Sequence, residues 1–162
     1  MSDYQKAKEK ALELLDLYNI KEPIVPVFDI AKTEGLKIVG FENSDKLRDF
    51  SGFFNSKEKT IYINIADSPN RQIFTVAHEL GHYKLQHDLK GLEILPRYVN
   101  PIAKDPNEQE ANFFAANLLV PENMLRKMMK KYKLNSFDTD LLAKLFGVSK
   151  EVMVYRVKDL EL

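Results

Sequence analysis

Residues 68–88 read SPNRQIFTVAHELGHYKLQHD. Ser68 followed by Pro69 is typical of a helix start, with serine as the N-cap and proline at the first helical position. Apolar and small side chains follow on several sides, so we expect a largely buried helix that runs to about His87. The pentapeptide HELGH at 78–82 lies in its middle and contains two of the three histidines of the chain.

The HELGH segment predicts a metal site. Residues four apart on a helix lie one above the other, so His78 and His82 can present two imidazole nitrogens to one ion. Glu79 lies about 100° around the helix from His78, where it can reach a metal-bound water without being a ligand. A surface histidine pair with a salt-bridging glutamate is the alternative, but burial of such side chains without partners is costly. We therefore expect Zn²⁺ here, with Glu79 as the catalytic base.

A catalytic zinc site needs a third protein ligand and leaves one position for water. The extended pattern HExxHxxGxxH is not followed, because Leu85 and Asp88 stand where it requires glycine and histidine. His87 lies five residues past His82, away from the ligand face. A contact to a metal ligand, a contact to the substrate and a surface position are equally open for it. The third ligand is therefore expected to be a carboxylate on a second helix.

The second helix begins at Asp105, an N-cap residue, and carries two candidate ligands. Glu108 stands at the third helical position, where a capping box would use its carboxylate. Glu110 has no such local task and shares an apolar face with Phe113, so a metal ion would supply the counter-charge that it needs. We predict Glu110 as the third ligand, ahead of Glu108, Asp105 and Asp88.

FTVAHELGHYKLQHD followed by EQEANFFAANLLVP resembles the ImmA/IrrE family of metallo-endopeptidases. The similarity extends upstream into SGFFNSKEKTIYINIADSPNRQ and covers about residues 20–125. The resemblance implies a gluzincin-like site with zinc on His78, His82 and Glu110, and with Glu79 as general base. All four residues are present, which implies an active enzyme.

Composition narrows the classes of protein that remain. The 162 residues include 24 basic and 24 acidic side chains, so no net charge attracts the chain to nucleic acid. The absence of cysteine excludes disulfides, thiolate zinc sites and cysteine nucleophiles. The amino terminus follows an amphipathic helix pattern and not that of a signal peptide, and no apolar run reaches the ~18 residues of a membrane span. We expect a cytoplasmic protein that does not associate with membranes.

The remaining patterns predict an α+β fold, a mainly helical zincin-like domain. A helix pattern at 4–18 and a short helix after Pro26 precede a strand at 36–41. SGFFN (51–55) and TIYIN (60–64) flank a short turn, which is typical of a β-hairpin. We therefore expect a small sheet of three antiparallel strands, and a long loop after the metal-binding helix. An extended substrate could add a strand to an exposed edge of this sheet near SGFF or TIYIN.

No internal repeat or linker divides the chain, so we expect one zinc metallopeptidase domain over residues 1–162. Residues 1–125 would form the catalytic core with the N-terminal helix. Residues 126–162 would form C-terminal helices packed on that core.

The tail LLAKLFGVSKEVMVYRV resembles a helix-turn-helix core, with a turn at Gly147 and a helix cap at Ser149. Such a unit can place a helix in a major groove. The alternative is a helical hairpin that packs its many apolar side chains on the protein core. From Pro121 onward there are only 9 basic and 6 acidic residues, and the second helix has few donors suited to base edges. We favour the packed hairpin and expect no direct DNA binding.

Peptide hydrolysis commonly needs a second donor to the oxyanion besides the metal. The candidates are His87, Tyr98, Arg97 and Arg71. Arg71 could instead tie the hairpin to the metal-binding helix.

The family resemblance implies a zinc endopeptidase with a narrow protein substrate, often a helix-turn-helix transcriptional repressor of a phage or mobile element. The alternative is a non-cleaving module, stabilised by metal, that binds a repressor or DNA in regulation or in a toxin-antitoxin pair. Glu79 argues against this alternative, because a structural metal site has no need of a base. Nothing in the sequence indicates an oligomeric state.

Overall fold

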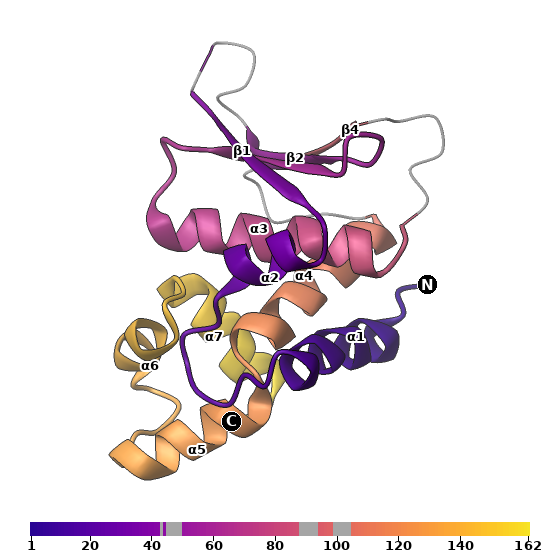
Figure 1. Ribbon diagram of the computed structural model, residues 1–162. Helices are drawn as coiled ribbons and strands as arrows, with labels where there is room; N and C mark the ends of the chain where they lie inside the picture. The colour runs from indigo at the N-terminus through magenta and orange to yellow at the C-terminus, as the bar shows by residue number, and fades with distance from the viewer. Residues whose placement is uncertain (43, 45–49, 88–93, 99–104) are drawn as a thin grey trace.

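The computed structural model describes residues 1–42, 44, 50–87, 94–98 and 105–162, and for 94–98 it describes the backbone alone. In these residues the helices and strands follow in this order: α1 (Tyr4–Leu17), α2 (Val27–Thr33), β1 (Lys37–Phe41), β2 (Phe50–Asn55), β3 (Thr60–Asn64), α3 (Pro69–Lys84), β4 (Ile94–Tyr98), α4 (Pro106–Leu119), α5 (Glu122–Tyr132), α6 (Thr139–Phe146) and α7 (Lys150–Asp159) (Figure 1).

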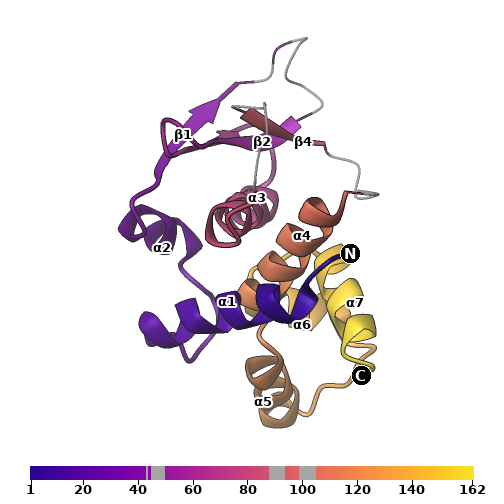
Figure 2. The same cartoon turned by 90° about the vertical axis from the view of Figure 1, so that its right-hand side faces the viewer.

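The α+β fold is confirmed, and its elements form layers around α3. The sheet covers one side of α3, while α4 crosses its other side and α1 lies against α4 (Figure 2). Every residue of α3 from Thr75 to His82 is buried, because the helix is enclosed between sheet and helices. Among the described residues, no helix combines the length and the apolar character needed to span a membrane.

The sheet is mixed and has the strand order β1-β3-β2-β4. The predicted hairpin is present, with β2 and β3 antiparallel. The prediction that all strands are antiparallel is wrong for β1, which pairs parallel to β3. The strand β1 pairs with the second strand of the hairpin and not with the first, so its direction relative to its partner is reversed.

The fourth strand, β4, occupies part of the segment that the sequence predicts as loop, and pairs antiparallel with β2. Its Pro96 fits the edge of a sheet, where a missing N–H is tolerated. Because β2 and β3 each have strands on both sides, the prediction of an exposed edge near SGFF or TIYIN is wrong.

Helix α3 starts as predicted, with Ser68 Oγ accepting from the backbone N–H of Arg71 at 3.4 Å. It ends at Lys84, three residues before the predicted end at His87. Gln86 adopts a left-handed conformation, with φ of 55°, and the N–H of His87 then donates to the carbonyl of His82 at 3.2 Å. This is the Schellman pattern of helix ends, which folds His87 back toward the helix.

Helices α3 and α4 approach each other closely at Gly81. A Cβ atom at this position would lie 2.9 Å from Cδ1 of Phe114 and 3.3 Å from the Cα atom of Ala111. Hydrogen in place of a side chain therefore permits this helix crossing, which brings the first turns of α4 over the HELGH segment.

The C-terminal segment contains the predicted helical hairpin, α6 and α7, with Gly147 in a left-handed conformation between them. Phe146 and Met153 are buried in the same apolar cluster as residues of α3. The buried Arg156 of α7 donates to the carbonyl of Val120 at 2.9 Å and to Asn117 Oδ1 at 2.8 Å. These contacts join the hairpin to the end of α4.

Candidate metal centre

His78 and His82 aim their Nε2 atoms at one point inside the protein. The two nitrogens lie 3.1 Å apart, and the two residues are 0% and 2% exposed. One nitrogen of each ring and one carboxylate oxygen of Glu79 all lie within 4.8 Å of one another. The HELGH segment therefore gathers the two imidazoles and the carboxylate that the sequence analysis expects at a metal site.

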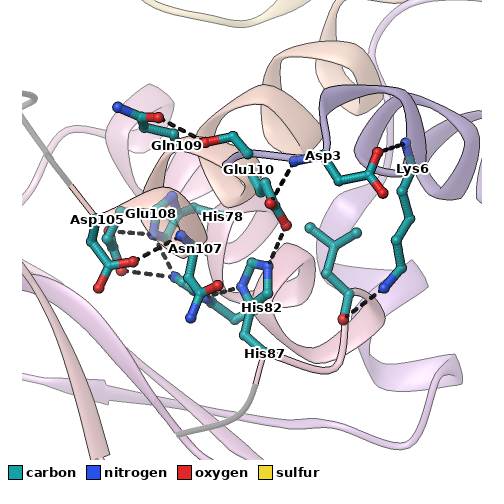
Figure 3. A network of polar contacts seen from close by, with 12 residues as sticks. Asp3, Lys6, His78, His82, His87, Asp105, Asn107, Glu108, Gln109 and Glu110 are labelled. Carbon is teal, nitrogen blue, oxygen red and sulfur yellow. Dashed lines mark hydrogen bonds and ion pairs between the residues drawn. The ribbon is translucent and has the colours of Figure 1, made fainter.

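Glu108 completes this group from the first turn of α4 (Figure 3). Its Oε2 lies 3.2 Å from His78 Nε2, and its Oε1 lies 3.0 Å from His82 Nε2. Ligand atoms around a tetrahedral zinc ion, with bonds of 2.0–2.1 Å, are about 3.3 Å apart. Two imidazoles and one carboxylate at these separations fit a zinc ion in both donor type and size.

The structure differs from the sequence prediction for Glu110. Its Oε2 lies 3.0 Å from His87 Nε2, and its Oε1 accepts the backbone N–H of Asp3 at 2.6 Å (Figure 3). Two residues along a helix correspond to a rotation of about 200°, so Glu108 and Glu110 face different sides. Glu108 faces α3, and Glu110 faces α1.

Glu110 was predicted on the assumption that a capping box uses the carboxylate of Glu108. Asp105 does cap α4, since its Oδ1 accepts the N–H of Asn107 at 2.8 Å. The carboxylate of Glu108 is directed at the histidines all the same. Asp105 is occupied by the cap, and Asp88, a further candidate ligand, lies outside the described residues.

The Nδ1 atoms of both histidines have defined partners. His78 Nδ1 lies 2.9 Å from Asn112 Oδ1, and His82 Nδ1 lies 2.8 Å from His87 Nδ1. A partner on one ring nitrogen fixes the orientation of the ring and the nitrogen left for a metal. Asn112 is a functional residue that was not predicted from the sequence, although its position four residues after Glu108 places both on one face of α4.

His87 lies inside the protein, with its side chain 5% exposed. Of the three roles left open by the sequence, the structure places it in contact with His82, a candidate metal ligand. The sequence reasoning placed it away from the ligand face because it assumed that the helix continues to this residue.

Contacts around the site keep the carboxylates of Glu108 and Glu110 ionised. Burial would raise the pKa of Glu108, but hydrogen bonds and positive charge from His78 and His82 outweigh it and hold the pKa well below its usual range. Burial would likewise raise the pKa of Glu110, but the N–H of Asp3 and the ring of His87 lower it. Burial lowers the pKa of His87 despite its contact with Glu110. Ionised carboxylates and neutral imidazoles are the forms that bind metal.

Three further residues were predicted as candidate oxyanion donors: Arg71, Arg97 and Tyr98. Arg71 Nε donates to Ser51 Oγ on β2 at 2.9 Å, which ties the hairpin to α3. Arg97 and Tyr98 belong to β4 by their backbone, but their side chains are outside the described part of the chain.

A cavity of about 300 Å³ opens beside the histidines. His82 and His87 line it from α3 and the turn that follows, and Phe54 lines it from β2. The ring of Tyr83 forms another wall and packs edge-on against Phe54, with ring centres 5.9 Å apart. Ser56, Lys59 and Gln86 add polar groups to its wall, and of the three candidate ligands His82 lines it.

Comparison with known proteins identifies the family of this chain. The family model described as the IrrE N-terminal-like domain, a peptidase family, matches residues 32–158. This chain belongs to the ImmA/IrrE family. The resemblance read from the HELGH and EQEANFFAANLLVP segments is thereby confirmed.

Two curated relatives in the ImmA/IrrE family carry activity names. Metallopeptidase ImmA of Bacillus subtilis is 29% identical over 98 residues, which are 60% of this chain and 56% of ImmA. Radiation response metalloprotease IrrE of Deinococcus radiodurans is 32% identical over 109 residues, which are 67% of this chain and 33% of IrrE. The chain thus spans about half of ImmA and a third of IrrE.

A third relative matches nearly end to end. Uncharacterized immunity region protein 2 of Bacillus phage phi105 is 26% identical over 97% of this chain and 91% of its own length. Among solved structures, a Mycobacterium tuberculosis transcriptional regulator superposes with a TM-score of 0.68 over 96% of this chain and 47% of its own, at 16% identity. At this identity the likeness concerns the fold alone.

Proposed function

We propose that this chain is a zinc-dependent endopeptidase that hydrolyses peptide bonds of a specific cytoplasmic protein. The observation that carries the proposal is the convergence of two imidazole nitrogens and a carboxylate at 3.0–3.2 Å, with Glu79 directly beside them. Membership in the ImmA/IrrE family supports it, as do the names of two relatives, a metallopeptidase and a metalloprotease.

The zinc ligands in this proposal are His78, His82 and Glu108. Glu108 replaces Glu110, because the oxygens of Glu108 contact both imidazoles while those of Glu110 contact His87 and Asp3. Two neutral nitrogens and one carboxylate oxygen are a ligand set found in catalytic zinc sites, which keep a further position for water.

When bound, zinc would supply Lewis acidity, which lowers the pKa of a bound water toward ~7 and polarises a carbonyl group. Glu79 is the general base. Its carboxylate accepts a proton as the water oxygen attacks the carbonyl carbon, and then gives this proton to the nitrogen of the leaving amine. Glu79 is buried, so bulk water does not compete with it for the proton.

A second donor to the oxyanion is expected among side chains near the site. Both ring nitrogens of His87 have partners within 3.0 Å, and Arg71 donates to Ser51, which argues against these two. Arg97 and Tyr98 stay as the candidates predicted from the sequence.

The substrate that we propose is a helix-turn-helix repressor of a phage or mobile element. Support comes from the relative in phage phi105, which is named after its immunity region and matches 97% of this chain. The cavity between Phe54, Tyr83 and His82 can accept an apolar side chain next to the scissile bond.

The test is cleavage of a helix-turn-helix protein, with the product of any such gene adjacent to the gene for this chain tested first. The purified, zinc-loaded protein is incubated with that helix-turn-helix protein, and fragments are identified by mass spectrometry. Glu79→Gln is the matched control, since it keeps the size of the side chain and the metal ligands but removes the base. Fragments from the unmodified protein alone are expected. Equal fragments from both proteins would contradict the role of Glu79, and binding without fragments from either would favour the non-cleaving module.

A further inference from the structure

We propose that His87 and Glu110 are positioning residues: together they hold His82 in the tautomer that binds metal through Nε2, and the start of α1 holds Glu110 in turn. This inference rests on the proposed metal site at His78, His82 and Glu108. It assigns a task to the two residues whose position differs most from the sequence prediction.

The first step is the position of the protons. A neutral imidazole has one N–H group and one nitrogen with a free lone pair. If His82 binds metal through Nε2, its proton sits on Nδ1 and points at His87 Nδ1, 2.8 Å away. His87 Nδ1 must then accept, so its own proton sits on Nε2 and points at Glu110 Oε2, 3.0 Å away. Glu110, which can only accept, thus fixes the tautomer of His87, and His87 in turn fixes the tautomer of His82.

The second step is the anchor of Glu110. Asp3 is the N-cap of α1, and its side chain accepts the N–H of Lys6 at 2.9 Å. In a capping box, a glutamate three residues after the N-cap would accept the backbone N–H of the N-cap. Lys6 occupies this position in α1, and its side chain has no acceptor atom. Glu110 of α4 takes this role, with its Oε1 2.6 Å from the backbone nitrogen of Asp3.

Neighbouring contacts hold the start of α1 against α4. Ser2 Oγ donates to Gln109 Oε1 at 2.8 Å, and the rings of Tyr4 and Phe113 lie 4.9 Å apart between centres. The carboxylate of Glu110 therefore joins three elements, the start of α1, the helix α4 and the turn after α3. Displacement of α1 would release Glu110, and through it the ring of His82.

The experiment measures zinc affinity by chelator competition, together with the absorption spectrum of the cobalt-loaded protein. His87→Phe and Glu110→Ala remove the two links, and each is expected to weaken zinc binding about 10–100-fold. The double variant should be no weaker than the weaker single variant, because both act on the same ring. His87→Gln keeps an acceptor for His82 and a donor for Glu110, and should recover most of the affinity.

Two controls separate the possible outcomes. Lys10→Ala removes an ion pair with Glu13 on α1 that has no part in the relay, so it should bind zinc like the unmodified protein. If His87→Phe does not fold, Glu110→Gln carries the same test, since Asp3 and His87 contact different oxygens of Glu110 and glutamine replaces one of these acceptors by a donor NH₂ group.

Zinc affinity that is unchanged in His87→Phe and Glu110→Ala would overturn the relay, provided that the unmodified protein binds one zinc ion. If the unmodified protein binds none, the proposed metal site itself fails. Loss of zinc in Glu110→Ala with full affinity in His87→Phe would also overturn the relay, because Glu110 would then be a direct ligand.

Discussion

His78 and His82 lie one turn apart on α3 and aim the same ring atom at one point, yet different parts of the molecule hold their rings. Asn112, on the neighbouring helix α4, contacts His78 directly. His82 contacts His87, beyond the end of α3, which in turn contacts Glu110 and through it the start of α1.

The crossing of α3 and α4 therefore orients His78, one half of the site, by itself. The other half requires a helix end with a left-handed residue, Gln86, and a third helix docked nearby. The His78 half is therefore expected to withstand changes in α1, and the His82 half to respond to them.

The largest loss of bound zinc is expected for substitution of Glu108, whose carboxylate contacts both His78 and His82. Glu108→Ala removes the carboxylate that contacts both imidazoles, so one zinc ion per chain should no longer be retained after dialysis. Glu110→Ala is the matched control on the same helix and should retain zinc with weakened affinity. Metal content measured by atomic emission checks both, and the reverse order of the two variants would return Glu110 to the role of ligand.

The next largest effect is expected at the crossing itself. Gly81→Ala places a Cβ atom 2.9 Å from the Phe114 ring, and should cost about 1–3 kcal/mol in free energy of unfolding. It should also weaken zinc binding, because it moves Glu108 and Asn112 together. Phe114→Ala removes the two nearest atoms, Cδ1 and Cγ, so in that background Gly81→Ala should cause smaller losses in urea titration and in chelator competition. Equal stability of Gly81→Ala and the unmodified protein would show that the crossing is not close.

The independence of the two halves is tested by Asn112→Ala. Loss of the Nδ1 partner of His78 should weaken zinc binding about 10–100-fold. Combined with His87→Phe, the two losses in binding free energy should add, because each variant frees a different ring. A double variant no weaker than either single one would show that the halves act as one unit.

The smallest effect is a change in the free energy of unfolding, and it is expected for Glu34, which joins α1, α2 and α3. Glu34 accepts from Lys84 Nζ at 2.6 Å and from the Tyr18 hydroxyl at 2.7 Å, and this hydroxyl has its pKa raised to about 12, first by its hydrogen bond to Glu34. Burial would raise the pKa of Glu34, but these partners lower it below the ordinary value of 4.5.

A lowered carboxyl pKa stabilises the folded state above pH 4.5, and this contribution is lost as the pH falls through the folded pKa. Glu34→Gln should therefore destabilise the protein by about 1 kcal/mol at neutral pH and by progressively less below pH 4.5. Urea titrations over this pH range measure the difference. A difference that does not change with pH would contradict the assignment, and zinc affinity should not change.

Local signals in the sequence were sufficient for much of the fold and for half of the site. Ser68 and Pro69 mark the start of α3 through capping chemistry, and the spacing of His78 and His82 follows from helix geometry alone. The alternating pattern around the turn at 56–59 was sufficient for the hairpin of β2 and β3. These features depend on residues close together in the chain.

Tertiary contacts decided the rest. Which face of α4 meets α3 depends on the crossing at Gly81, so the choice between Glu108 and Glu110 was not available from local patterns. His87 reaches His82 because Gln86 is left-handed, a conformation that a glycine would have signalled. The parallel pairing of β1 follows from strand order, which no pattern within β1 records.

We propose that one zinc ion is bound between α3 and the first turn of α4. Anomalous diffraction from crystals of the zinc-loaded protein, recorded on both sides of the zinc absorption edge, locates the ion directly. We expect one peak at bonding distance from His78 Nε2, His82 Nε2 and a carboxylate oxygen of Glu108, with Glu110 still in contact with His87. A peak bonded to Glu110, or no peak near the two histidines, would contradict it.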